Sequence, residues 1–214
     1  MAKARREGQA TIALKRGALV QVELAVKRLF DIVVCLLLAV LLSPFLVVLG
    51  LVVKLSSAGP VFFFQKRIGY RGRPVTIAKF RTMTALRDGP APTRWSSSEE
   101  ERITRVGHFL RDYGLDELPQ LFNILKGDMS IVGPRPPLPD VAKGFTPRER
   151  EMFAMRPGVI SLAAVEGRRS ITMEQRTGLH VKYVERWSLW LDVMILARAL
   201  SVVLRRVNVD EISD

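Results

Sequence analysis

Two adjacent carboxylates at the start of a predicted helix are the residues of this sequence best suited to chemistry. Asp116 and Glu117 stand just before Pro119 in the run Leu-Asp-Glu-Leu-Pro-Gln. Proline is favoured in the first turn of a helix, so both carboxylates should lie at or near a helix N-terminus. There the helix dipole keeps a carboxylate ionised and attracts phosphate. An ionised Asp116 could attack phosphorus, and an ordinary acidic helix cap is the structural alternative.

A second carboxylate beside a nucleophile is typical of a Mg²⁺ site that substrate phosphates complete. Glu117 is the first candidate ligand, and Asp192, an acid on an otherwise apolar, Trp-bearing segment, is the second. Asp192 could instead form an ion pair with Arg186 or Arg198. The chain has one cysteine and no cluster of His and Cys of the kind that binds zinc, and we expect both histidines to be structural.

Basic side chains beside predicted turns and loops are candidates for binding phosphate. Arginine binds phosphate through paired hydrogen bonds, and lysine binds it as a point charge. The candidates are Lys79, Arg81, Arg111, Arg135 and Arg168. Each could instead be a solvated surface charge or a contact for lipid headgroups.

An uncharged stretch, residues 32–53, indicates that these side chains work at a membrane. As a helix it would be about 33 Å long, which is enough to cross a bilayer. Ser43 and Pro44 stand at its midpoint, where proline should break the helix and serine can satisfy a freed backbone group. Basic residues flank both ends, and positive charge marks the cytoplasmic side. We therefore expect a re-entrant helix-break-helix in the cytoplasmic leaflet, with a straight span or a buried soluble helix as alternatives.

The strongly basic composition fits this location. The net charge is +12, from 33 Lys and Arg against 21 Asp and Glu. Such a balance suggests anionic lipid, phosphorylated substrates or nucleic acid as partners. Beside a membrane segment, anionic headgroups explain most of it, so no nucleic acid partner is expected.

The remaining patterns predict an α+β, helix-rich chain in three parts: a basic arm (1–26), the re-entrant helix (27–55) and a catalytic domain (56–214). Runs 61–68 and 74–80 predict a short β-hairpin. Helices are predicted from a capping box at Ser98 and Glu101, over 115–126, over 148–155 and, amphipathic and Trp-bearing, over 183–203. The last of these could lie in the membrane interface or close the protein core. Residues 133–139 should be a rigid, extended loop.

The motifs, taken together and in order, resemble the bacterial sugar transferases of the monotopic phosphoglycosyl transferase superfamily. The matching pieces are Lys27-Arg28-Leu-Phe-Asp31, Ser43-Pro44, Gly59-Pro60 to Gly69, Lys79-Phe-Arg81-Thr-Met83, Leu115 to Asn123, Lys126 to Pro136, Arg156-Pro-Gly158, Tyr183, and Trp187 to Asp192. They cover roughly residues 27–204. The chain looks like the minimal catalytic form, without the N-terminal spans of larger members.

The resemblance implies an active site on the cytoplasmic face of the bacterial inner membrane. Such enzymes move a sugar-1-phosphate from a nucleoside diphosphate sugar, here expected to be a UDP-sugar, to polyprenol phosphate. By position, Asp116 would be the nucleophile and Glu117 would serve Mg²⁺, with Asp192 nearby. Arg135 and Pro136 would contact the nucleotide.

The resemblance also places Lys79, Arg111 and Arg168 on phosphates. This chain departs from the family pattern at Ile160-Ser-Leu162 and Ala164, where a Thr-Gly-Leu run and Gln are usual, and at His180, where Asp often stands. These changes bear on donor specificity.

Two alternatives to this reaction stay open. One is a membrane-anchored basic adaptor without enzymatic activity, which binds anionic lipid or nucleic acid. The other keeps the enzyme class but has water or the lipid attack directly. Monotopic embedding would also allow a homo-oligomer.

Overall fold

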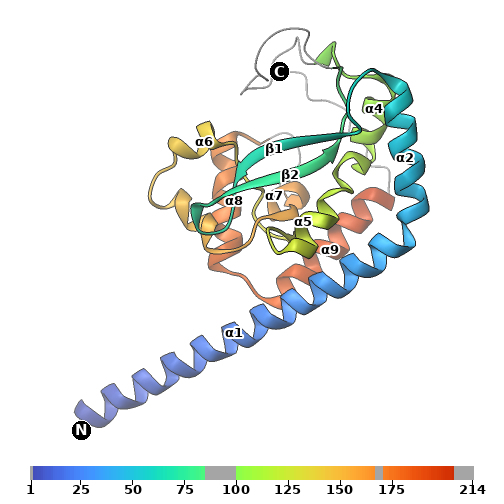
Figure 1. Cartoon of the computed structure of the whole chain (residues 1–214). Coiled ribbons are helices and arrows are strands. Elements are labelled where there is room, and N and C mark those ends of the chain that lie inside the picture. Colours follow the sequence, from blue (N-terminus) through green and yellow to red (C-terminus); the bar gives the residue numbers. More distant parts are fainter. Residues whose placement is uncertain (1, 85–99, 167–170, 205–214) are drawn as a thin grey trace.

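The computed structural model describes residues 2–84, 100–166 and 171–204, with the backbone alone at 2–18 and 202–204 (Figure 1). A long helix, α1 (Ala2–Leu41), leads into α2 (Ser43–Ser56), and a compact body of short helices and strands lies against them. Helix α1 continues without a break across the predicted boundary between the basic arm (1–26) and the re-entrant helix (27–55).

The break between α1 and α2 lies where Ser43 and Pro44 predicted it. The two helices bend by 65°, and the Ser43 hydroxyl donates to the Val40 carbonyl at 2.8 Å. Pro44 has no N–H for that carbonyl, so the serine replaces the lost hydrogen bond. Within the described residues neither helix alone is long and apolar enough to cross a bilayer, but Leu19–Leu41 and Ser43–Ser56 together are.

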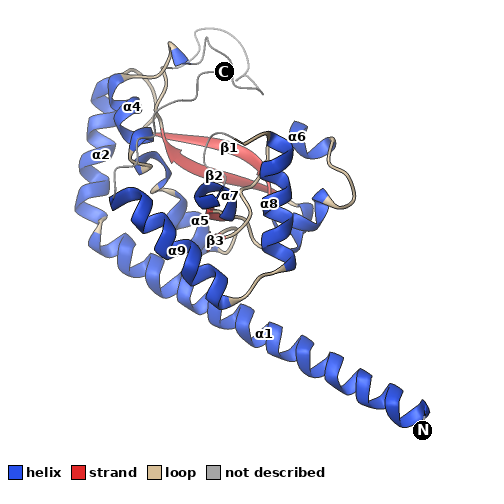
Figure 2. Cartoon of the chain, turned by 180° about the vertical axis from the view of Figure 1, so that it is seen from behind, coloured by secondary structure: helices blue, strands red, loops and turns tan. Residues whose placement is uncertain are grey.

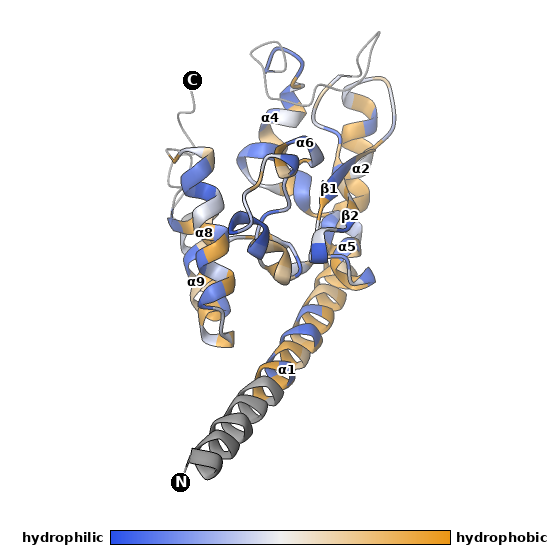
Figure 3. Cartoon of the chain, turned by 90° about the vertical axis from the view of Figure 1, so that its left-hand side faces the viewer, coloured by the Kyte–Doolittle hydropathy of each residue, from blue (hydrophilic) through white to orange (hydrophobic). Residues whose placement is uncertain are grey.

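Both helices are rich in apolar residues (Figure 3), and many of these side chains are exposed. Leu37, Leu41, Val47 and Leu55 are each more than 60% exposed. Outward-facing side chains of this kind are typical of a lipid-facing surface. Insertion as a re-entrant hairpin stays a prediction.

Polar residues on one face of α1 fasten this helix to the body. Arg28 donates to the last carbonyls of a short helix, Ile124 and Leu125 (2.7 and 3.0 Å). Asp31 accepts from the Ser130 hydroxyl and the Ile131 amide, at 2.7 and 3.1 Å. These contacts fix α1 to the segments on either side of Gly127.

The predicted hairpin is confirmed. Strands β1 (Phe62–Ile68) and β2 (Pro74–Phe80) pair antiparallel, with Phe63 opposite Lys79 and Arg67 opposite Val75. A 3₁₀ turn, η1 (Tyr70–Gly72), connects them. The buried Phe80 packs with Leu49 and Val53 of α2, which ties the hairpin to this helix.

A second, parallel pair of strands was not predicted. Strand β3 (Ser130–Val132) pairs with β4 (Gly158–Ile160). Each has three residues, too few for an alternating pattern to appear in the sequence.

The helices differ from the prediction in their boundaries. The observed elements are α4 (Arg105–Asp112), η2 (Leu115–Glu117), α5 (Gln120–Lys126), α6 (Pro139–Lys143), η3 (Glu149–Ala154), α7 (Leu162–Glu166), α8 (Met173–Glu185) and α9 (Leu189–Leu204). Thr104 caps α4 through the Gly107 amide, so the predicted cap at Ser98 is not the start of this helix; Ser98 itself lies outside the described residues.

The predicted C-terminal helix over 183–203 is two helices. The chain leaves α8 at Arg186 and begins α9 at Leu189, so Tyr183 and Trp187 lie outside α9. Helix α9 packs against α7 (Figure 2) and reaches α1 through the contact of Asp192 with Lys27. Its Ile195 is buried, while Trp190 is 68% exposed. It therefore closes the core on one face and presents apolar side chains outward on the other.

Candidate active site

Asp116 and Glu117 lie in a 3₁₀ turn directly before α5, as the sequence predicted. Gly114 takes a left-handed conformation (φ 66°) that turns the chain into η2, and Pro119 is the N-cap residue of α5. Gly127, with φ 97°, ends α5. Glycine tolerates such angles without steric cost.

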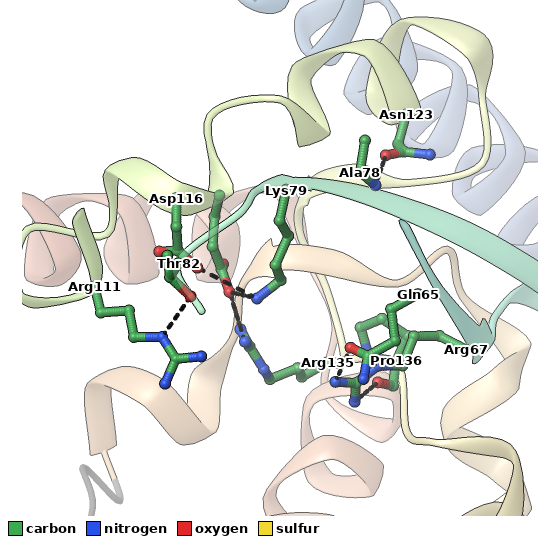
Figure 4. A network of polar contacts seen from close by, with 11 residues as sticks. Gln65, Arg67, Ala78, Lys79, Thr82, Arg111, Asp116, Asn123, Arg135 and Pro136 are labelled. Atoms are coloured by element: carbon green, nitrogen blue, oxygen red, sulfur yellow. Dashed lines mark hydrogen bonds and ion pairs between the residues drawn. The ribbon is translucent and has the colours of Figure 1, made fainter. Parts of the chain in front are cut away.

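Asn123 docks this segment against the hairpin. Its side-chain amide accepts from the Ala78 N–H at 3.0 Å and donates to the Thr76 carbonyl at 2.8 Å (Figure 4). The amide thus pairs with the free edge of β2 as a neighbouring strand would. This contact places the turn with Asp116 and Glu117 beside Lys79, near the end of β2.

Glu117 is held between two cations. It accepts from Lys79 Nζ at 2.6 Å and from Arg135 Nη2 at 2.6 Å, with a longer Arg135 contact of 3.4 Å. Burial alone would raise the pKa of Glu117, but the charges and hydrogen bonds of Arg135 and Lys79 outweigh it and lower the pKa to about 2. Glu117 is therefore ionised at neutral pH and orients both cations.

Asp116 is the less neutralised carboxylate. It is 8% exposed, and Lys79 Nζ lies 3.8 Å from its Oδ2. Burial raises its pKa; Glu117 adds to the increase, whereas Lys79, Arg111 and Arg135 oppose it. A carboxylate of raised pKa is a stronger base and nucleophile when it is ionised.

Arg111 approaches Asp116 from α4. Its Nε donates to the Thr82 hydroxyl at 2.9 Å (Figure 4). Helix α4 is itself held at Thr82, whose carbonyl accepts from the Thr104 amide at 3.0 Å. A side chain at Gly107 would collide with the same carbonyl, so glycine is needed for this approach.

The parallel strands position Arg135. It follows β3 in the loop Gly133–Pro139, which was predicted to be extended and becomes helical only at Pro139. A Cβ at Gly133 or at Gly158 would collide with the opposite strand's backbone. This close approach fixes the loop and directs Arg135 toward Glu117.

Two predicted site residues that the structure describes, Arg81 and Asp192, are not part of this group. Arg81 is buried and donates to the Val53 and Ser57 carbonyls at the end of α2 (3.2 and 2.6 Å), so it holds the end of this helix. Arg168 lies outside the described residues.

Asp192 belongs to a separate network. It accepts from Lys27 (2.6 Å), Tyr183 (2.7 Å) and Trp187 (3.3 Å). Its predicted ion pair with Arg186 or Arg198 is wrong, because Lys27 is the partner and Arg198 lies 3.4 Å from Glu166. The geometry gives no support to a metal shared by Asp192 and Glu117.

Binding of Mg²⁺ stays a prediction. No group of three His, Cys, Asp or Glu side chains that could hold a metal occurs in the part of the chain that the structure describes. Glu117 fits an ion that takes most of its oxygen ligands from substrate phosphates. Its Oε2 is the less engaged oxygen, with only the 3.4 Å contact to Arg135.

Sequence reasoning missed two residues near Arg135. Arg67 and Gln120 line a narrow pocket with Arg135 and Pro136. The sequence did contain a signal for Arg67. Side chains alternate between the two faces of a strand, so residues 63, 65 and 67 of β1 share the hairpin face on which Lys79 lies.

Known proteins resemble this chain over most of its length. The family model described as bacterial sugar transferase matches residues 22–206. A UDP-glucose:undecaprenyl-phosphate glucose-1-phosphate transferase of Caulobacter vibrioides is 40% identical over 190 residues, which are 85% of this chain and 71% of that protein. The uncharacterized sugar transferase EpsL of Bacillus subtilis is 40% identical over 178 residues, which are 83% of this chain and 87% of that protein.

A UDP-glucose:undecaprenyl-phosphate glucose-1-phosphate transferase of Escherichia coli is 39% identical over 182 residues, 79% of this chain but 38% of that protein. The matched region thus includes the Asp116–Glu117 turn and the segments that hold it. These matches show that the chain belongs to the bacterial sugar transferase family and is an enzyme of that kind.

Proposed function

We propose that this enzyme transfers a sugar-1-phosphate from a UDP-sugar to undecaprenyl phosphate, as a membrane step in glycoconjugate or exopolysaccharide synthesis. The observation that carries the proposal is the pair Asp116 and Glu117 in one turn, with cations from three elements around it. The names of the Caulobacter and Escherichia relatives support the substrate classes, and a relative in Sinorhizobium fredii is an exopolysaccharide production protein.

The proposed reaction has two displacements at one phosphorus. An Asp116 oxygen attacks the phosphorus that carries the sugar, and the bond to the nucleoside monophosphate breaks. The resulting aspartyl phosphosugar is attacked by a phosphate oxygen of undecaprenyl phosphate, which releases Asp116 and forms the lipid diphosphate sugar. Each step begins and ends with Asp116 or a phosphate as an anion, so no separate general base is required.

The surrounding residues stabilise charge in both steps. Lys79 and Arg111 lie near Asp116, and Arg135 is held at Glu117. Fixed cations beside a transferring phosphoryl group lower its barrier because they need no reorganisation during the reaction. Mg²⁺, which Glu117 and the donor phosphates would hold, would neutralise the diphosphate when bound.

The bent helix pair would place this site at the lipid surface. The exposed apolar faces of α1 and α2 would enter the cytoplasmic leaflet of the inner membrane, and Arg81 joins the end of α2 to the strand that carries Lys79. This arrangement would bring the site to the depth of a lipid phosphate.

The test is release of UMP from a panel of UDP-sugars, with purified protein, Mg²⁺ and undecaprenyl phosphate. The wild type should release UMP, and both Asp116→Asn and a chelator should stop it. If no donor yields UMP although the protein is folded and membrane-bound, the non-enzymatic adaptor is favoured instead. Salt-sensitive, sequence-independent DNA binding would not distinguish the two, because any protein of this charge shows some.

A further inference from the structure

Arg67 is a largely buried cation with neutral partners. Its guanidinium donates to Gln65 Oε1 at 3.0 and 2.6 Å and to the Pro136 carbonyl at 3.2 Å. Burial, with the nearby charge of Arg135, lowers its pKa to about 10. A buried guanidinium without a carboxylate is unfavourable unless an anion completes its surroundings.

Two further arginines, Arg135 and Arg176, lie near this group. Arg135 lines one pocket with Arg67, and within the described residues its ion-pair partner is Glu117. Arg176 of α8 is near enough that Arg135 adds to the effect of burial in lowering its pKa. Its backbone N–H donates to the Thr172 carbonyl, but its side chain makes no hydrogen bond or ion pair with any residue that the structure describes. Among the described residues, Arg135 is thus the one member of these three arginines that has an ion pair.

Two neutral polar side chains accompany these arginines without partners. Gln120 lines the pocket and is 3% exposed, and its amide has no hydrogen bond within the described part of the chain. His180, one turn beyond Arg176 on α8, is 4% exposed, and its Nδ1 is unpaired. Burial and the two arginines lower the pKa of His180 to about 4, so it is neutral at pH 7. Buried polar groups normally have partners, and their absence here points to a ligand.

We propose that Arg67, Arg135 and Arg176, with the Gln120 amide, form a subsite for a phosphate dianion beside the position of the transferred phosphate. Arginine forks and an amide donor match the oxygens of such a group. Arg135 connects the two positions, because it contacts Glu117 on one side and lines the Arg67 pocket on the other.

The identity of the phosphate rests on the proposed function. In that reaction two phosphates flank the transferred one: the phosphate that leaves with the nucleoside and the phosphate of the arriving lipid. Both are dianions of the same chemistry, so the experiment must distinguish these two sources.

The test measures binding without turnover. UMP, uridine and undecaprenyl phosphate are titrated onto the full chain in lipid nanodiscs, as wild type, Arg67→Gln and Arg176→Gln. Each variant should weaken one of the two phosphate ligands about tenfold or more, because it removes a charge-assisted contact, and leave uridine unchanged. Lys66→Gln is the matched control: it removes one charge from an exposed position next to Arg67 on β1.

Each outcome decides something. Loss of UMP affinity alone assigns the subsite to the nucleoside phosphate, and loss of undecaprenyl phosphate affinity alone assigns it to the lipid. Affinities equal to those of Lys66→Gln for both ligands, or a wild type that binds neither, overturn the subsite. Thermal unfolding verifies the fold, and the half-buried Arg176 carries the test if Arg67→Gln does not fold.

The result is independent of catalysis. If the wild type releases no UMP from any donor but the variants still weaken phosphate binding, the proposed reaction fails and the subsite stands. If the wild type turns over normally and the variants bind like the control, the subsite fails and the reaction stands.

Discussion

At the scale of single residues, the surroundings of Asp116 and Glu117 assign them different roles. Glu117 accepts short hydrogen bonds from Lys79 and Arg135, whereas Asp116 has a 3.8 Å contact with Lys79. The pKa therefore falls at Glu117 and rises at Asp116. This difference supports the proposed roles of Glu117 as an orienting anion and of Asp116 as the nucleophile, although the two carboxylates are neighbours in the chain.

A pH profile tests the role of Lys79. Its charge lowers the pKa of Asp116, against the effect of burial, so Lys79→Met should let that pKa rise further. In the proposed reaction ionised Asp116 is the reactive form, so the activity of the variant should decline at a higher pH during acidification. The measurement is kcat/KM against pH, with exposed Lys66→Met as the control. An acid limb at the same pH in both variants would contradict this role.

The residue types around the site were predictable, but several of their contacts were not. The Asp-Glu pair before Pro119 predicted a carboxylate site at a helix start, and the structure places it there. Arg81 follows Lys79 at a spacing that also suits the site, yet its guanidinium binds the end of α2. A sequence shows that a charged residue is present, but not whether its side chain will reach the site or the carbonyl groups at the end of a nearby helix.

At the scale of elements, the side-chain amide of Asn123 joins the turn that carries Asp116 and Glu117 to the hairpin. Asn123→Ala should leave the Thr76 carbonyl and the Ala78 N–H without partners, at a cost of about 1–3 kcal/mol each. We expect a melting temperature several degrees lower and a reduced kcat, because the turn with Asp116 loses its support.

The matched control for Asn123 is Lys126→Ala on the same helix. Its side chain is 76% exposed and pairs only with Asp128, so little change is expected. Equal melting temperatures for the two variants would show that the docking contact is not important.

Elements with a strong period were predictable, and short ones were not. The β-hairpin agrees with the sequence prediction within one residue at each end, because each strand has seven residues of β-rich sequence. The strands β3 and β4 have three residues each, and they form because Gly133 and Gly158 let the backbones approach. This close approach joins residues far apart in the chain, so no local sequence pattern predicts it.

At the scale of the whole molecule, a buried ion pair connects the first and last helices. Lys27 of α1 and Asp192 of α9 lie 2.6 Å apart with side chains 9% and 10% exposed. Asp192→Asn should cost about 3–5 kcal/mol, because Lys27 would stay buried without its counter-charge. Thermal unfolding measures this loss, and Lys27→Met with Asp192→Leu should recover much of it.

The control for Asp192→Asn is an exposed ion pair formed by Arg198, which lies on the same helix, and Glu166. Arg198→Gln removes a contact to Glu166 whose side chains are 57% and 32% exposed, and it should cost less than about 1 kcal/mol. Equal losses for Asp192→Asn and Arg198→Gln would contradict a structural role for the buried pair.

The topology of the bent helix pair is also testable. Gln21→Cys and Lys66→Cys place exposed thiols before and after the pair, in a Cys35→Ser background. A membrane-impermeant thiol reagent should reach both from the cytoplasmic side if the pair is re-entrant. Labelling from opposite sides would establish a straight span. Pro44→Ala restores a backbone N–H and should shift the result toward that span.

The most direct test of the account is a search for the aspartyl phosphosugar itself. The wild type is mixed with a UDP-sugar labelled in the sugar and with Mg²⁺, without undecaprenyl phosphate, then denatured and analysed by mass spectrometry. We predict one sugar-phosphate on the peptide that contains Asp116, release of one UMP per enzyme, and no label on Asp116→Asn. Transfer to undecaprenyl phosphate by a wild type that never becomes labelled, or by Asp116→Asn at the wild-type rate, would contradict the covalent mechanism.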